Sequence, residues 1–254
     1  MSVFALIRHR VAAGFLVVMS AIALTGAPAS ATAPSDHGDG HVLARTVVGD
    51  VVSVTQYTPA KGVSAEALYA KLRSAGVRGL VDPNAVRALD VYQCYYGTAY
   101  ALESGRCPAI QWSSVRPVVY FRDYSNANWP VSDAVPSWNT SPDIDVWWRT
   151  SACPSGSHCV TVNNSNYGAT KWAGKTSYSY STTTRFFIED SVKIQLNDYY
   201  SDTYGERRNT ACHEVGHAIG AGHNISTASC IYSTQGSAQN PTSDDINLLT
   251  HVIY

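Results

Sequence analysis

The stretch "TACHEVGHAIGAGHNISTASCIYS", residues 210–233, concentrates histidine, glycine and cysteine around a single glutamate. His213 and His217 are four residues apart, so on a helix their imidazoles share one face and can reach the same metal ion. Glu214 follows the first histidine and lies outside the ligand pair, where it can hold and deprotonate a metal-bound water. The spacing therefore predicts a helix that presents two metal ligands and one base.

Beyond this helix, Gly220 permits a sharp turn because a positive φ costs glycine little, and His223 can then return as a third ligand. Three histidines leave a fourth position open for water, which is typical of a catalytic zinc ion rather than a structural one. The alternative is a helix whose histidines are only packed or exposed. Five fixed positions agree with the pattern H-E-x-x-H-x-x-G-x-x-H, and they favour one zinc ion per chain.

The motif "HEVGHAIGAGH" resembles the zinc signature of the metzincin clan of endopeptidases, and within the clan the matrixin-like catalytic domain. "DDINLLTHVIY" is similar to the C-terminal helix of matrixins, and "VVYFRDY", "VSDAVPSWN" and "DIDVWW" follow their opening strand–helix–strand order. The resemblance covers residues 110–254. It implies an α+β fold, a metzincin-like zinc protease domain with a twisted mixed β-sheet, an active-site helix and a C-terminal helix.

The resemblance also implies roles for individual residues. His213, His217 and His223 would hold Zn²⁺, and Glu214 would be the general base that activates a zinc-bound water. An extended polypeptide substrate would pair with a partly exposed strand before the active helix, within "TTTRFFIED" or "SVKIQLND". The function predicted is that of a secreted zinc-dependent endopeptidase that hydrolyses peptide bonds.

Two features depart from the family pattern. Matrixins carry a methionine in a tight turn beneath the zinc, eight residues after the third histidine, and this chain has Ile231 there, followed by Tyr232. Ser233 stands where matrixins have a proline. No matrixin-like His-x-Asp site for a second, structural zinc ion is found, and structural Ca²⁺ stays compatible with the sequence without being indicated by it.

The cysteines number six, and all lie beyond the first thirty-odd residues. An even number in an exported chain predicts three disulfides, with fifteen pairings open, of which sequence neighbours give the simplest. "GRCPAI" around Cys107 faintly resembles the prodomain cysteine that blocks zinc in latent matrixins, although the even count favours a disulfide instead. The neighbour pairs are Cys94–Cys107, Cys153–Cys159 and Cys212–Cys230.

The pair Cys212–Cys230 bears on the missing methionine. Cys212 precedes the first ligand, and Cys230 precedes Ile231 in the turn expected beneath the metal. We expect a disulfide here to tie the turn to the helix, so that Ile231 needs to supply only apolar volume.

The chain divides into three predicted parts. Residues 1–31 have the basic start, apolar run and small-residue end of a signal peptide, with a signal anchor as the alternative. Residues 32–90 are predicted to be a propeptide, which would make the chain a zymogen, or an N-terminal accessory segment; the alternative assigns them to the mature domain. Residues 91–254 are the predicted metzincin-like catalytic domain.

Local patterns predict several elements. "RTVVGDVVSVTQYT" favours a strand, and "SAEALYAKLRSAG" favours a helix with Ser64 as its N-cap and Gly76 at its C-terminal end. Thr242 and Asp245 fit the start of a last helix by a capping box.

Composition limits the partners. The formal net charge is −1, which gives no reason to expect nucleic acid, and no stretch after the signal is apolar enough to expect a stable membrane partner. We expect a monomer. Two other functions stay open: a zinc-bearing binding protein with weak or lost activity, and a zinc hydrolase of non-protein amide bonds. A broad peptide digest would separate these from an endopeptidase.

Overall fold

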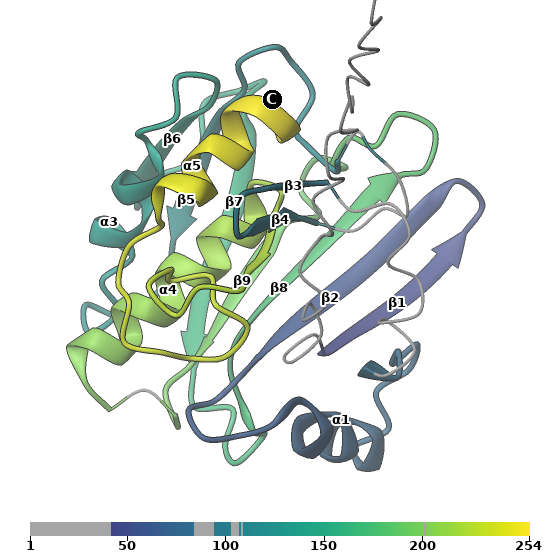
Figure 1. Cartoon of the computed structure of the whole chain (residues 1–254), viewed down its shortest axis with the longest axis vertical. Helices are drawn as coiled ribbons and strands as arrows, with labels where there is room; N and C mark the ends of the chain where they lie inside the picture. Colours follow the sequence, from purple (N-terminus) through teal and green to yellow (C-terminus); the bar gives the residue numbers. More distant parts are fainter. Residues whose placement is uncertain (1–41, 84–93, 103–106, 108, 201) are drawn as a thin grey trace, which may run out of the picture. The chain divides into compact units, whose positions relative to one another are not determined.

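A mixed sheet with the strand order β1-β2-β8-β9-β7-β5-β6 organises the chain (Figure 1). The computed structural model describes residues 42–83, 94–102, 107, 109–200 and 202–254. The strands are β1 (Val42–Val48), β2 (Val51–Pro59), β5 (Val118–Asp123), β6 (Asp145–Arg149), β7 (His158–Ser165), β8 (Trp172–Ser181) and β9 (Lys193–Asn197).

The sheet has a parallel half and an antiparallel half. Strands β6, β5, β7 and β9 pair in parallel, whereas β8, β2 and β1 add in antiparallel fashion beyond β9. The single strand predicted for "RTVVGDVVSVTQYT" is wrong, because the chain reverses at Gly49, whose φ is +62°, and forms the β1–β2 hairpin. Strand β2 then pairs along the whole of β8, so residues 51–59 belong to the main sheet.

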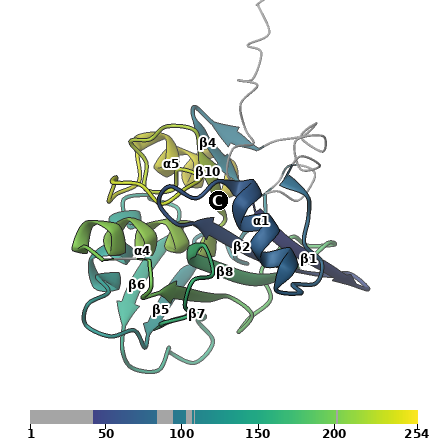
Figure 2. The same ribbon diagram turned by 90° about the horizontal axis from the view of Figure 1, so that it is seen from below.

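A smaller sheet and six helical segments complete the described fold. The second sheet has the order β10-β4-β3, and α5 lies beside it in both views (Figures 1 and 2). Its strands are β3 (Tyr95–Tyr96), β4 (Ala99–Ala101) and β10 (Ala221–Asn224). The helical segments are α1 (Ala65–Ser74), α3 (Val131–Ala134), the 3₁₀ segment η1 (Val135–Trp138), α4 (Tyr204–Ala218), α5 (Ser243–Leu248) and the π-helical segment η2 (Leu249–Ile253).

The helices begin where local chemistry predicts. The hydroxyl of Ser64 accepts from the Ala67 amide at the start of α1, as expected, and Gly76 follows its C-cap with a φ of +75°. The capping box of Thr242 and Asp245 starts α5 as expected. "VSDAVPSWN", expected as the helix of the strand–helix–strand order, forms the short α3 and then η1, with Pro136 near the start of the 3₁₀ segment. For "VDPNAVRALDVY", residues 81–92, the sequence predicts a turn and a further helical turn, and this stretch lies largely outside the described residues.

Two apolar clusters fill the interior. The main cluster joins the sheet to α4 and α5, and includes Phe121, Trp138, Ile194 and Leu248. A second cluster belongs mainly to the N-terminal segment, where Leu68 and Leu72 of α1 pack with Tyr57 and with Trp172 of β8. Among the described residues, no helix is long and apolar enough to cross a bilayer.

Candidate metal centre

Three buried histidines converge between α4 and β10. His213 and His217 lie on α4 with ring centroids 4.6 Å apart, and His223 of β10 places its ring 5.2 and 5.0 Å from theirs. One ring nitrogen from each lies within 4.8 Å of the other two, so the three residues could hold a metal ion. This is the set that the sequence motif brings together.

Backbone carbonyls orient two of the rings. Nδ1 of His213 lies 3.1 Å from the carbonyl oxygen of Cys230, and Nδ1 of His217 lies 2.9 Å from that of Ala221. A carbonyl oxygen only accepts, so each Nδ1 carries the proton and leaves the Nε2 lone pair for a metal. Such carbonyl contacts fix the tautomer of metal-binding histidines, and imidazole suits zinc among the common metals. The residues present therefore fit a zinc ion.

Glycines allow the chain to return from α4 to β10. Gly220 has a φ of +98°, which confirms the predicted turn, and a Cβ there would lie 2.6 Å from the carbonyl oxygen of Ile110. A Cβ on Gly222 would lie 2.6 Å from the carbonyl oxygen of Ala101 on β4. The third histidine thus reaches the first two because β10 approaches β4 without intervening side chains.

The turn at residues 229–232 supports the metal ligands from below. A disulfide joins Cys212 to Cys230, and the carbonyl of the same Cys230 holds His213. The carbonyl oxygen of Ile231 accepts from the amide of Asn224, the residue after His223. One turn therefore positions a ligand on the helix and the strand that carries another.

Ile231 fills the space beneath the helix. Its side chain is fully buried, and its Cδ1 would lie 2.5 Å from a Cβ at Gly216 on α4. Trp138 of η1 packs at the same glycine and donates its indole N–H to the carbonyl of Cys212. Tyr232 is half-buried, and it forms a bridge with Asn224.

Asp245 connects the last helix to this turn. Its buried carboxylate accepts from Asn224 Nδ2 at 2.7 Å, from Ser229 Oγ at 2.7 Å and from the amide of Thr242 at 2.6 Å. Sequence reasoning identified Asp245 as a capping residue only. Its spacing from Thr242 gave that role, whereas its contacts with the turn depend on how α5 packs.

The carboxylate of Glu214 lies on the opposite side, against the sheet. Thr58 of β2 donates to Oε1 at 2.6 Å, and Thr176 of β8 donates to Oε2 at 2.5 Å. Burial raises the pKa of Glu214 to about 8, although the two hydroxyls and the ammonium group of Lys175 lower it in part. Glu214 thus connects α4 to the antiparallel half of the sheet.

Thr58 and Thr176 were not predicted from the sequence. They lie 156 and 38 residues from Glu214, and no local pattern marks either one. The prediction that "SVKIQLND" offers an exposed strand to substrate is wrong, because β9 lies between β7 and β8. "TTTRFFIED" is not an edge strand either, since it forms a turn with isolated bridges after β8.

The remaining cysteines pair as sequence neighbours. Cys94 is bonded to Cys107 and Cys153 to Cys159, and no cysteine is free. The three predicted pairs are therefore the pairs of the structure. The sulfur of Cys107 is not available as a zinc ligand in this form of the chain.

Comparisons with known proteins identify no family. No protein-family model matches the chain, and no curated protein matches it. Two solved structures of myroilysin are similar, one with 14% identity, a TM-score of 0.35, and coverage of 55% of this chain and 93% of that one. The other has 12% identity, a TM-score of 0.34, and coverage of 55% and 84%. At these TM-scores neither likeness carries an argument.

Proposed function

We propose that this chain is a secreted zinc endopeptidase of the metzincin type. In this proposal His213, His217 and His223 hold one zinc ion, and Glu214 is the general base. The observation that supports it most is the convergence of three buried imidazoles, two of them oriented by carbonyl groups, next to a buried carboxylate on the same helix. A turn, a disulfide and a C-terminal helix hold that group in place.

The chemistry divides between metal and protein. Zinc, when bound, supplies a Lewis acid that polarises a carbonyl group and lowers the pKa of water. Glu214 takes a proton from the attacking water and passes it to the leaving amine, so no covalent intermediate with the enzyme is needed. Each oxygen of the carboxylate accepts one threonine hydroxyl in the structure and has a second lone pair that can take the proton.

The substrate proposed is an extended polypeptide. A zinc-bearing protein without activity is less well supported, because Glu214 is not a ligand and yet is fully buried and held by two hydroxyls. Three disulfides without a free thiol support export to an oxidising compartment. Residues 91–254 are the proposed catalytic domain.

Hydrolysis of denatured casein tests the proposal. The chain is assayed after its N-terminal segment has been cleaved, with and without a chelator, and then after zinc is restored. We expect hydrolysis that stops with the chelator and returns with zinc. Hydrolysis that continues in the presence of the chelator would contradict the zinc assignment. A zinc-loaded chain that hydrolyses no polypeptide would contradict the proposed endopeptidase activity.

A further inference from the structure

Strand β2 covers the edge of β8 that faces the base. In the register of this pair Thr58 lies opposite Gly174, and Gln56 lies opposite Thr176. A Cβ on Gly174 would collide with Oε1 of Glu214, so the carboxylate packs directly against the backbone where β2 and β8 pair. Without β2, the edge of β8 beside Glu214 would be unpaired.

The chain after Thr58 is held on both sides, as an extended peptide is held in a cleft. On one side the amide of Ala60 donates to the carbonyl of Lys171, just before β8. On the other side the carbonyl of Pro59 accepts from the amide of Gln235, and the amide of Lys61 donates to Oε1 of Gln235. Successive residues thus bond to opposite walls, which is the pattern of strand addition.

The two walls belong to the candidate active site. One is β8, which carries Thr176 and Gly174 against Glu214. The other is the segment that follows the turn beneath the ligands, where Gln235 also donates to Thr210 on α4. Residues 58–61 therefore pass between the base and that segment, through the space that a substrate of this enzyme would need.

The face of β2 toward α4 changes from apolar to polar as it nears Glu214. Val52 and Val54 belong to the main apolar cluster, whereas Gln56 and Thr58 are buried polar residues. Oε1 of Gln56 makes no hydrogen bond among the described residues, and a buried acceptor without a partner destabilises the folded state. This end of the strand suits a binding cleft more than a permanent core.

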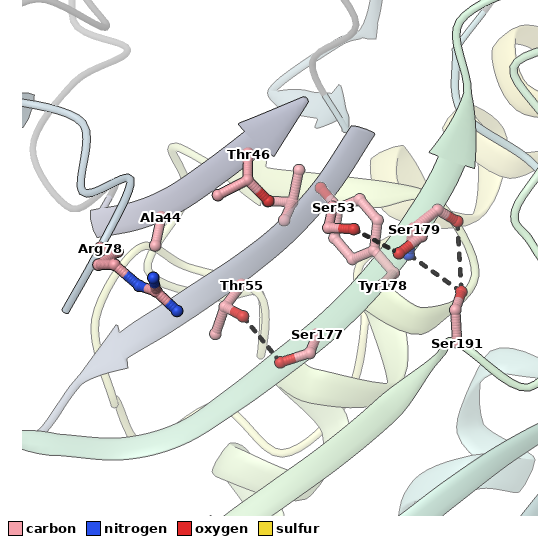
Figure 3. A pocket seen from close by; sticks show the side chains of 10 residues that line it. Ala44, Thr46, Ser53, Thr55, Arg78, Ser177, Tyr178, Ser179 and Ser191 are labelled. Carbon is pink, nitrogen blue, oxygen red and sulfur yellow. Dashed lines mark hydrogen bonds between the residues drawn. The ribbon is translucent and has the colours of Figure 1, made fainter. Parts of the chain in front are cut away.

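On the other face, β2 and β8 are joined mainly by hydroxyl pairs. Ser53 lies 2.8 Å from Ser179, and Thr55 lies 2.9 Å from Ser177, around a cavity of about 210 Å³ that Arg78 also lines (Figure 3). Hydrogen bonds between two neutral hydroxyl groups each contribute little net free energy to folding. Residues 42–61 contribute only Val52, Val54 and the partly buried Leu43 to the main apolar cluster, so their departure would leave most of that cluster in place.

We infer that residues 42–61 occupy the peptide-binding cleft from within the same chain, and that β8 is the strand to which a polypeptide substrate adds. This inference rests on the proposed function. The chain as folded is then latent, because Thr58 occupies one oxygen of the base and β2 occupies the substrate edge. Cleavage after β2 and loss of the segment would free both.

A covalent lock between β2 and β8 tests this inference in the full chain. Ser53→Cys with Ser179→Cys joins opposed residues of β2 and β8, whereas the control, Thr46→Cys with Ser53→Cys, joins β1 to β2 only. Each protein is cut by limited trypsin at Lys61, whose side chain is 72% exposed, and the cut is verified by mass. The protein is then diluted and separated from released fragments.

Two readouts follow, and one needs no catalysis. Binding of a fluorescent peptide with the sequence "VVSVTQYTPAK", residues 51–61, is measured by anisotropy, and casein hydrolysis is measured on the same samples. We expect the wild type and the β1–β2 control to lose the fragment, bind the peptide and gain activity by about tenfold or more, because the competent fraction rises. The β2–β8 lock should do none of these.

Equal peptide binding or equal activity in the locked and control proteins would overturn the inference. So would an uncut chain that is already as active as the cut one. A cut, zinc-loaded control that binds the peptide but hydrolyses no casein would overturn the endopeptidase while leaving the occupied cleft intact.

Discussion

The three candidate metal ligands and the candidate base, Glu214, are held by different kinds of contact. A disulfide, a turn and backbone carbonyls fix the histidines, all within residues 212–245. Hydroxyl groups from two strands hold Glu214, and one of these, Thr58, comes from the N-terminal hairpin. The contacts that hold the histidines come from nearby residues and include a disulfide. The contacts that hold Glu214 depend on the pairing of β2 with β8, two strands that are far apart in the sequence.

This difference matches what each side must do. Metal ligands need a constant geometry, which outer contacts enforce. A base must be reached by water and substrate, and Thr58 can leave Glu214 together with its own strand, although a hydrogen bond to an ionised carboxylate contributes about 1.5–3 kcal/mol. We therefore expect substitutions near the histidines to affect mainly zinc binding, and substitutions at or near Glu214 to affect mainly catalysis.

The largest separation is expected from Glu214→Ala. The variant should keep its zinc, because Glu214 is not a ligand, and should lose about 10³-fold in kcat/KM, because proton transfer is lost. Zinc content and casein hydrolysis are measured on one preparation. Glu206→Gln, on the same helix and able to keep its cap, is the control. Activity near that of the wild type would show that another group moves the proton.

Removing the disulfide between Cys212 and Cys230 should mainly affect stability and zinc retention. Cys212→Ala with Cys230→Ala opens a loop with a sequence separation of 18 and should lower the free energy of unfolding by about 3 kcal/mol. Zinc should also dissociate more readily, because the carbonyl of Cys230 positions His213. Cys153→Ala with Cys159→Ala should lower stability alone. Equal zinc affinity in both double variants would contradict this account.

Gly216→Ala tests the packing beneath the helix. The new methyl group would lie 2.5 Å from Cδ1 of Ile231 and 2.6 Å from Cζ2 of Trp138, so we expect a loss of about 1–3 kcal/mol. Adding Ile231→Val removes the Cδ1 atom and should restore part of the stability. Gly205→Ala, whose nearest neighbour is at 3.4 Å, is the matched control. Equal melting temperatures for Gly216→Ala and Gly205→Ala would show that Ile231 and Trp138 are not tightly packed against Gly216.

The smallest effect is expected from Ile231→Met, which restores the residue of the family pattern. A change of similar volume should cost less than about 1.5 kcal/mol and leave zinc content and activity unchanged, because the disulfide already fixes the turn. Calorimetry and the casein assay check this. A large gain in activity would show that the isoleucine limits the enzyme.

Features that depend on nearby residues could be predicted from the sequence. The helical spacing of His213 and His217, the turn at Gly220 and the capping box at Thr242 each involve residues within a few positions. The disulfides also join neighbours. In each case local geometry leaves few alternatives.

Features that depend on strand order could not be predicted in this way. The residues of β9 alternate as an edge or a central strand would, and only the pairing with β7 and β8 shows that they are central. The contact between Thr58 and Glu214 requires β2 to join the sheet at β8, across more than a hundred residues. The composition of residues 51–59 does not indicate that β8 is the strand with which they pair.

In the proposed function, one zinc ion at the three histidines makes this chain a peptidase. Chelator-treated, cleaved protein is titrated with Zn²⁺ while bound metal and casein hydrolysis are measured together. The account predicts that hydrolysis rises in proportion to bound zinc and levels off at about one ion per chain, with neither signal in His217→Ala. Full hydrolysis by protein that contains less than about a tenth of an equivalent of zinc would contradict it.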